Sequence, residues 1–216
     1  MGDLFRNFIG AGIAICFLLP ARKELPAKTI AISRTILIIL VGLQIYPIMV
    51  ALIDEHHARR QFPILSDFQT SRQLHRWEGG AAYSIEKNIG TPGNCALRAD
   101  LDTQRYSGVA LKYFPRNWQG YRYFEYRVYN PSEKPIKLTC RIHDRMHTLG
   151  PQLYEDRFNK THSFSSGWHT LTINLDDIRI APSNREMDLS QIYAVGLFAT
   201  QLPHSRTIYI DDVRLY

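Results

Sequence analysis

The sequence predicts a mainly β protein, a jelly-roll β-sandwich preceded by a two-helix transmembrane hairpin. Three observations lead to this fold class. Two long apolar runs lie within residues 1–53. After them, about nine short segments alternate between apolar and polar residues, which is the pattern of half-buried strands. Turn residues separate these segments, as in sandwiches and jelly rolls.

The two apolar runs are Phe8 to Leu19 and Thr35 to Ile53. The second run holds 19 residues without a formal charge. As a helix it would be about 28 Å long, close to the thickness of a hydrocarbon core. We therefore expect residues 1–53 to form a transmembrane hairpin. The first run also has the length of a signal-peptide core, although the following Ala21-Arg-Lys-Glu24 is a poor cleavage site.

Positive charges near the two runs predict how the chain is oriented. The connector between the runs holds more of them than either flank, namely Arg22, Lys23, Lys28 and Arg34. The positive-inside rule then places this connector in the cytoplasm. The chain is therefore expected to be an integral membrane protein, in contact with lipid, with its β-domain on the exterior (periplasmic or extracellular) side.

A polar stem, residues 54–64, is expected to lead into a single globular domain, residues 65–216. This length suffices for one domain with a substantial core. The net charge is +6, but the basic residues are spread along the chain. Because no basic block stands out, the sequence does not indicate a nucleic-acid partner.

Alternation along the strands predicts which side chains face the core. Phe124, Tyr126 and Val128 share one face of a strand. In the next strand the apolar positions from Ile136 to Ile142 face the core, after a turn or short loop at 130–135. Further strands are predicted at Ala81–Lys87, Asn94–Asp102, Gly108–Phe114, Phe158–Phe164, Trp168–Leu175, Ile192–Thr200 and Thr207–Leu215. Trp118 either rims a groove or anchors its loop in the core, and anchoring is favoured.

The first segment contains an Asp-x-x-x-Asn-x-x-Gly motif. Asp3, Asn7 and Gly10 carry it and would share one helix face. This motif resembles the pattern near the final membrane segments of the VanZ-like family. The resemblance covers only about 50 residues, so the hairpin looks like the end of such a domain. It implies a link to glycopeptide tolerance but no defined chemistry.

A second resemblance spans nearly the whole β-domain. Its motifs are Leu65-Ser-Asp-Phe68 followed by Trp77, Phe114-Pro-Arg-Asn-Trp-Gln-Gly-Tyr121, Val128-Tyr-Asn-Pro131, Asp156-Arg-Phe-Asn159 and Tyr209-Ile-Asp-Asp-Val-Arg-Leu215. In this order they resemble the galactose-binding-like sandwich of family-eleven carbohydrate-binding modules and complex I intermediate-associated proteins. The resemblance implies noncatalytic binding, usually of polysaccharide, on a concave sheet face.

The same resemblance often brings a structural calcium ion. Asp67 and Asp212 match positions near the metal site of that family, and calcium requires several converging oxygens. The first and last strands are commonly neighbours in such sandwiches, so the two carboxylates are expected to approach each other. An ordinary ion pair with Arg72 or Arg214 is the alternative.

Outward-facing polar and aromatic side chains are the candidates for ligand binding. They are Tyr123, Glu125, Arg127, Tyr129, Arg141 and His143 on the two alternating strands, with Asp144, Arg157 and Asn159 after them. Aromatic rings stack on sugars, while charged and amide groups bind hydroxyl pairs. The same residues also fit a solvated sheet face with ion pairs, such as Glu125 with Arg127 or Arg141.

The sequence contains none of the common enzyme signatures. A Gly-x-Ser-x-Gly elbow, a phosphate-binding glycine loop, a Cys-x-x-Cys pair and a His-Glu-x-x-His helix are all missing. We therefore expect a membrane-anchored, noncatalytic protein that binds polysaccharide or envelope glycan. The alternative is a tethered protein-interaction or assembly domain with a membrane-protein partner. Cys95 and Cys140 either form one disulfide or fill the core as free thiols.

Overall fold

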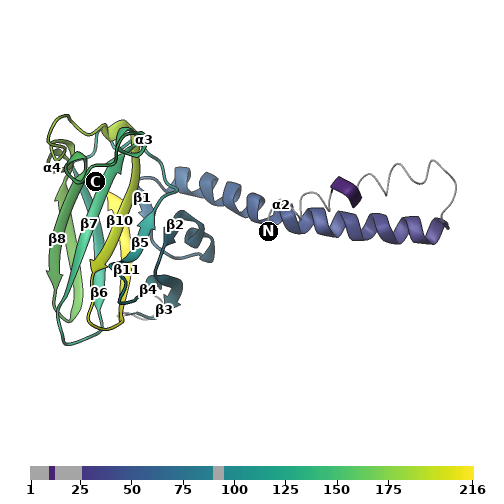
Figure 1. Cartoon of the computed structure of the whole chain (residues 1–216), viewed down its shortest axis with the longest axis horizontal. Helices are drawn as coiled ribbons and strands as arrows, with labels where there is room; N and C mark the ends of the chain where they lie inside the picture. Colours follow the sequence, from purple (N-terminus) through teal and green to yellow (C-terminus); the bar gives the residue numbers. More distant parts are fainter. Residues whose placement is uncertain (1–9, 13–25, 90–94) are drawn as a thin grey trace. The chain divides into compact units, whose positions relative to one another are not determined.

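The long helix α2, Ala27–Gln61, contains the whole second apolar run (Figure 1). The computed structural model describes residues 10–12, 26–89 and 95–216, and the chain divides into two compact units, Met1–Ile53 and Asp54–Tyr216. Within the described residues, α2 is the one helix long and apolar enough to cross a membrane. Only 6% of its most apolar window is buried, and a helix of this kind near the N-terminus fits a membrane anchor or a signal sequence.

The predicted first spanning segment falls largely outside the described residues. So do Asp3 and Asn7 of the VanZ-like motif, although Gly10 is described. The hairpin therefore stays a prediction. Lys28 and Arg34, which the sequence analysis placed in the connector, lie instead on the first turns of α2.

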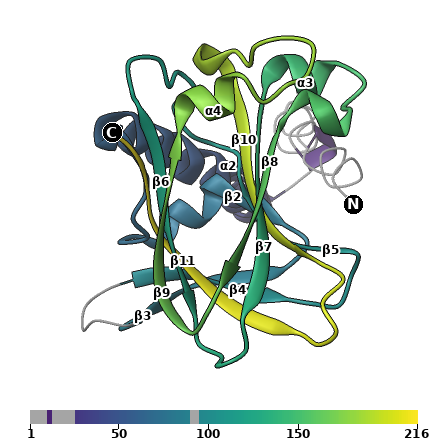
Figure 2. The same ribbon diagram turned by 90° about the vertical axis from the view of Figure 1, so that its left-hand side faces the viewer.

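The second unit is a sandwich of two antiparallel sheets (Figure 2). Sheet A has the strand order β3-β4-β11-β6-β9, with β1 also paired to β11, and sheet B has the order β2-β5-β10-β7-β8. The strands are β1 Ile64–Ser66, β2 Trp77–Gly79, β3 Ala82–Lys87, β4 Cys95–Leu101, β5 Tyr106–Leu111, β6 Tyr123–Asn130, β7 Ile136–Asp144, β8 Phe158–Phe164, β9 Gly167–Asn174, β10 Ile192–Thr200 and β11 Arg206–Leu215. All nine predicted strands are confirmed, and the short β1 and β2 are additional.

The chain changes sheet at most of its connections. Among the described strands, only β3 with β4 and β7 with β8 are sequence neighbours that pair directly. This alternation between two sheets resembles the jelly-roll arrangement. Two short helices, α3 Arg145–Leu149 and α4 Leu175–Arg179, follow β7 and β9 and lie at the same end of the sandwich (Figure 1, Figure 2).

The inner faces of the two sheets form the hydrophobic core. The positions predicted to face inward in β6 and β7 are all buried. Trp118 is fully buried and stacks on Phe124, with ring centroids 5.2 Å apart, so its anchoring role is confirmed. Cys95 and Cys140 are buried free thiols rather than a disulfide, and burial raises the pKa of Cys140 to about 12.

The end of α2 belongs to the β-unit through a buried ion pair. Arg76 is 1% exposed, and its guanidinium donates to both carboxylate oxygens of Asp54 at 2.8 and 3.0 Å. A third bond runs from Arg76 Nη1 to the carbonyl of Leu65 at 2.6 Å. The segment predicted as a polar stem is therefore helical as far as Gln61, with Asp54 buried on the β-unit.

Candidate functional site

The structure divides the predicted ligand-binding residues between opposite faces of the sandwich. Sequence reasoning assumed that β6 and β7 were neighbours in one sheet. The strands instead lie in different sheets, because the six-residue link 130–135 crosses from sheet A to sheet B. Asn130 supports this crossover: its fully buried side chain donates to the carbonyls of Lys134 and Phe164, both at 3.1 Å.

The four candidates on β6 lie on the outer face of sheet A, where they already have partners. Glu125 accepts a bond from Arg214 at 2.6 Å, and Arg127 pairs with Asp212 at 3.2 Å. The predicted pair between Glu125 and Arg141 is therefore wrong. Aromatic rings of the same face pack on one another. The ring of Tyr129 lies 5.2 Å from that of Trp168 and 5.8 Å from that of Tyr209, and the ring of Tyr123 lies 5.2 Å from that of Tyr216. This face fits the solvated, internally paired alternative.

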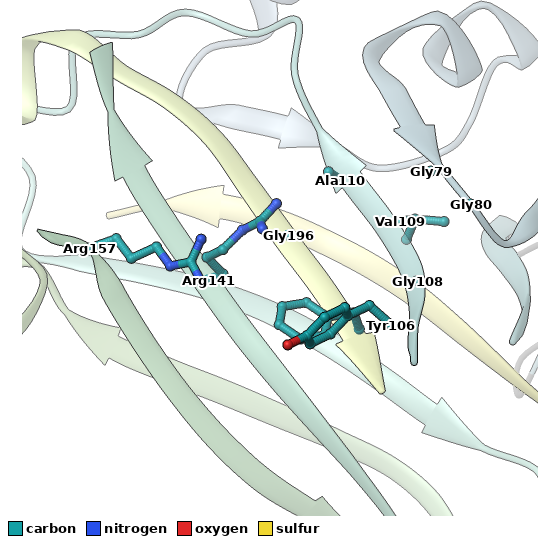
Figure 3. A pocket seen from close by; sticks show the side chains of 10 residues that line it. Gly79, Gly80, Tyr106, Gly108, Val109, Ala110, Arg141, Arg157 and Gly196 are labelled. Atoms are coloured by element: carbon teal, nitrogen blue, oxygen red, sulfur yellow. The ribbon is translucent and has the colours of Figure 1, made fainter. Parts of the chain in front are cut away.

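The outer face of sheet B contains an open trough of about 410 Å³ (Figure 3). Its floor consists of small residues from β5, β10 and the end of β2, namely Gly79, Gly80, Gly108, Ala110 and Gly196. Strand pairing makes this floor continuous, because Gly196 pairs with Ala110 on one side and with Arg141 on the other. A side chain at Gly108 would collide with the backbone of Leu197 and Phe198, so the sheet requires glycine there.

Aromatic rings and arginines form the rim of the trough. Tyr106 is 59% exposed and meets Phe198 edge to face, with ring centroids 5.8 Å apart. The guanidinium of Arg141 lies 5.7 Å from the centroid of the Phe198 ring. Its Nε is 3.5 Å from where a Cβ on Gly196 would stand. Figure 3 shows Arg157 beside Arg141, with both side chains extending across the sheet in the direction of Gly196.

Buried polar atoms without partners gather on this face. Among the described residues, six buried side-chain nitrogen or oxygen atoms lack a hydrogen-bond partner. Four of them are Arg141 Nε, His143 Nδ1, Arg157 Nε and Asn159 Oδ1. Arg141 and Asn159 occupy paired positions of β7 and β8. Because buried polar groups in folded proteins almost always have a partner, this cluster is a candidate for ligand contacts.

Electrostatics of the cluster are set by burial among cations. Burial lowers the pKa of His143 to about 3, and the neighbouring Arg141 lowers it further in the same direction. The imidazole is therefore neutral at neutral pH and offers one donor and one acceptor. Burial also lowers the pKa of Arg141 from its ordinary value, as does the positive charge of Arg157.

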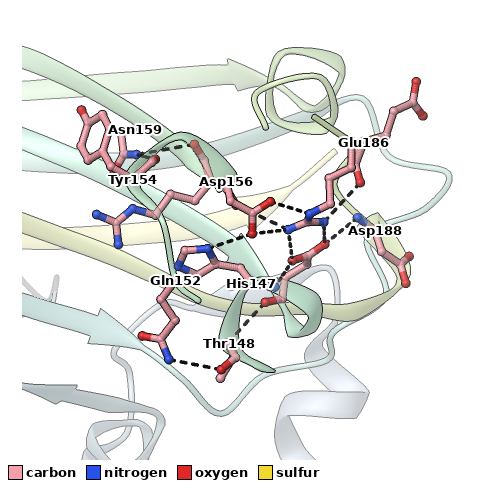
Figure 4. A network of polar contacts seen from close by, with 11 residues as sticks. His147, Thr148, Gln152, Tyr154, Asp156, Asn159, Glu186 and Asp188 are labelled. Carbon is pink, nitrogen blue, oxygen red and sulfur yellow. Dashed lines mark hydrogen bonds and ion pairs between the residues drawn. The ribbon is translucent and has the colours of Figure 1, made fainter. Parts of the chain in front are cut away.

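Asp144 is bound within a polar network that includes His147, Asp156 and Asp188, which Figure 4 labels, and is therefore not free for a ligand. It is fully buried, caps α3 through the amide of His147 at 3.0 Å, and accepts two bonds from Arg185 at 2.5 and 2.8 Å. Arg185 also donates to Asp156 at 2.6 Å, and the Asp156 carboxylate accepts a hydrogen bond from His147 Nδ1 at 3.2 Å. Although burial alone would raise the pKa of Asp144, the bonds from Arg185 and from backbone amides lower it.

The proposed calcium ligands are neighbours, but their donor set does not fit the ion. The pairing of Ser66 with Val213 brings Asp67 and Asp212 to adjacent strands, as expected. Asp67 Oδ1, however, accepts from the side-chain amide of Gln73 at 2.5 Å, and Asp212 is paired with Arg127 rather than with Arg214. In the described ranges, no group of three or more His, Cys, Asp or Glu side chains is arranged to hold a metal, whereas calcium takes 6–8 oxygen ligands.

The sequence analysis missed the aromatic rim and the floor of the trough. Tyr106 and Phe198 lie on β5 and β10, whose outward faces were not considered. One signal was available, because Gly108 and Gly196 stand within predicted strands. A glycine inside a strand marks a bulge or a place where another group approaches the backbone closely.

Comparison with known proteins identifies the fold of the β-unit. No family model matches the chain, and no curated protein is similar to it. Among solved structures, it is similar to an exo-β-agarase (14% identity, TM-score 0.56, covering 71% of this chain and 25% of that chain) and to the agarase AgWH50C (13%, 0.54, 70% and 24%). It is also similar to the family 11 carbohydrate-binding module of Clostridium thermocellum, solved in complex with a β-1,3-1,4-mixed-linked tetrasaccharide (14%, 0.50, 70% and 93%).

These similarities concern the fold alone. The chain spans about a quarter of each agarase, whereas it covers nearly all of the family 11 module. The β-unit therefore has a carbohydrate-binding-module-like fold of two β-sheets.

Proposed function

We propose that this protein is a membrane-anchored glycan-binding protein whose ligand lies in the trough on sheet B. One observation carries the proposal: four polar side chains, each with one buried atom that lacks a hydrogen-bond partner, lie on the same face as an open trough with an aromatic rim. The sandwich resembles a module that was solved with a bound oligosaccharide, which supports the same ligand class.

The chemistry of the trough suits a sugar chain. The exposed ring of Tyr106 offers an apolar surface on which the C–H face of a sugar ring can pack. Arginine, histidine and asparagine side chains nearby supply donors and acceptors for hydroxyl groups. The glycine floor lets a ligand approach the backbone of β5 and β10, as a flat polymer requires.

We propose that the domain binds the glycan without cleaving it. Most glycoside hydrolases use two carboxyl groups that flank the scissile bond, about 5–10 Å apart. Among the described residues that line the trough, none is Asp or Glu. Glu78, which precedes Gly79 on β2, accepts a hydrogen bond from the Tyr113 hydroxyl at 3.0 Å. The acidic side chains of the network around Asp144 are bound to Arg185 and His147.

We further propose that α2 anchors the protein and that the β-unit lies on the exterior side. The exposed apolar surface of α2 supports an anchor, and the positive charges at 22–34 support the orientation. Within this proposal, the apolar run from Phe8 to Leu19 is the first helix of a hairpin, and the VanZ-like motif lies at the start of that helix.

Binding is tested with the full chain in detergent micelles and a panel of neutral and acidic polysaccharides. We expect saturable binding to at least one polymer and no release of shorter products. If no polysaccharide binds, and the chain instead co-purifies with one membrane protein, the glycan proposal is rejected in favour of the assembly domain.

Orientation is tested with a reporter fused after Tyr216 that is active only outside the cytoplasm. The proposal predicts an active reporter. A stably produced but silent fusion, together with activity of a matching cytoplasmic reporter at the same position, would reverse the orientation.

A further inference from the structure

The outer face of sheet B carries more positive than negative charge. Glu78 on β2 is an outward acid of this face, and it accepts a hydrogen bond from the Tyr113 hydroxyl at 3.0 Å. On β5, β7, β8 and β10, alternation places Lys137 and Arg141 outward, and Lys112 follows β5 on the same side. The other outward positions of these four strands carry glycine, alanine, aromatic, hydroxyl, histidine or amide side chains. Arg157 adds a further cation at the rim.

The two arginines of the trough differ from those on the opposite face. On sheet A, Arg98 pairs with Asp100 at 3.0 Å, Arg127 with Asp212 at 3.2 Å and Arg214 with Glu125 at 2.6 Å. In the part of the chain that the structure describes, Arg141 and Arg157 have no carboxylate within ion-pair distance. The same domain thus neutralises its arginines on one face and leaves them unneutralised on the other.

Two unneutralised guanidinium groups side by side are unfavourable without an anion. Arg141 and Arg157 are both half-buried, and each has a buried Nε without a hydrogen-bond partner. Like charges at close range disfavour the charged forms. An anionic group placed between them would remove this repulsion and satisfy the free donors. The planar guanidinium fork binds carboxylate and sulfate oxygens through paired hydrogen bonds.

We propose that the ligand of the trough is an anionic glycan, whose carboxylate or sulfate groups bind Arg141 and Arg157 while a sugar ring packs on Tyr106. This inference rests on the proposed glycan-binding function and narrows its ligand class. Lys112 and Lys137 add long-range attraction for the polymer, which is expected to weaken as salt concentration rises.

The test uses polymer pairs that differ only in charge. The full chain in detergent micelles is titrated with polygalacturonate and with the same polymer after its carboxyl groups are reduced to alcohols. A sulfated galactan and its desulfated form make a second pair. We expect one anionic member to bind at least about tenfold more tightly than its neutral partner, the size expected for hydrogen bonds to a charged group.

Variants locate the preference on the protein. Arg141→Gln and Arg157→Gln each remove a charge but keep a donor, and either is expected to reduce the anionic preference by about tenfold. Arg127→Gln makes the same change on the opposite face and is expected to leave the preference unchanged. Equal thermal midpoints of the variants would show that all of them are folded. A reduced anionic preference in both Arg141→Gln and Arg157→Gln could then not be explained by the misfolding of a single variant.

The outcomes separate this inference from the function on which it rests. Equal affinity for charged and neutral polymers overturns the anionic ligand but leaves glycan binding intact. An anionic preference that survives both trough variants and falls in Arg127→Gln overturns the assignment to Arg141 and Arg157. If the protein binds none of the four polymers and no member of the wider panel, both proposals are overturned.

Discussion

Replacing Asp54 by alanine is expected to lower the free energy of unfolding of the β-unit by about 3–5 kcal/mol. The substitution would leave Arg76 charged and buried without its carboxylate. Arg76 is 1% exposed, and its bonds to Asp54 are 2.8 and 3.0 Å long. Removing one partner of a buried pair is costly, because the remaining charge keeps its desolvation penalty and loses its compensation.

Glu55 provides a matched control on the same helix. It pairs with Arg59 at 2.7 Å, but both side chains are more than half exposed. Glu55→Ala is therefore expected to change stability by about 0.5 kcal/mol or less. Denaturant unfolding of the full chain, followed by fluorescence of the buried Trp77 and Trp118, measures both variants. Similar small losses in the two variants would show that the pair contributes little to the β-unit.

The same contact sets the boundary of the folded unit. A fragment that begins at Gln61 lacks Asp54 and leaves Arg76 without its carboxylate partner, whereas one that begins before Asp54 retains the ion pair. The sequence offered no signal for this contact, since the two residues are 22 positions apart and join a helix to a short segment before β2. Burial of a charged pair follows from tertiary packing and not from a local pattern.

Most of the sandwich could be predicted from local alternation. In β6 and β7 the apolar residues recur at every second position, and these side chains fill the core. The assignment of strands to sheets could not be predicted in this way. A strand has the same side-chain period whichever sheet it joins, so the crossing between sheets after Asn130 could not be predicted. The prediction therefore placed Glu125 and Arg141 wrongly on one face.

The candidate site was predicted only in part, because residue chemistry can be read from the sequence whereas the pairing of strands cannot. Arg141, His143, Arg157 and Asn159 were named from residue chemistry, and the structure brings them together on sheet B. Tyr106 and Phe198 were not named, because their contact depends on the register between β5 and β10, in which Tyr106 pairs with Thr200 and Gly108 pairs with Phe198. Such register follows from the turns and the core of the whole domain.

Filling the trough is expected to abolish glycan binding while preserving the fold. The three atoms nearest to a Cβ at position 196 would be side-chain atoms of Arg141, at 3.5 to 3.8 Å, which is ordinary contact. Gly196→Leu should therefore fold, because its larger side chain projects into the trough and away from the core. Its side chain would exclude a sugar ring from the glycine floor and displace the guanidinium of Arg141, and we expect affinity to fall at least about tenfold.

Thr170→Leu is the matched control for this change. Thr170 is exposed on β9, on the outer face of sheet A, so the variant adds a leucine of the same size to the opposite face. It is expected to bind glycan as the wild type does. Thermal midpoints of both variants should lie close to that of the wild type.

The most direct test is therefore one titration of three full-length proteins, wild type, Gly196→Leu and Thr170→Leu, against the polysaccharide that the wild type binds most tightly. The trough account predicts that binding falls at least about tenfold in Gly196→Leu and is unchanged in Thr170→Leu. Unchanged binding in Gly196→Leu, with loss in Thr170→Leu, would contradict it and place the glycan on sheet A.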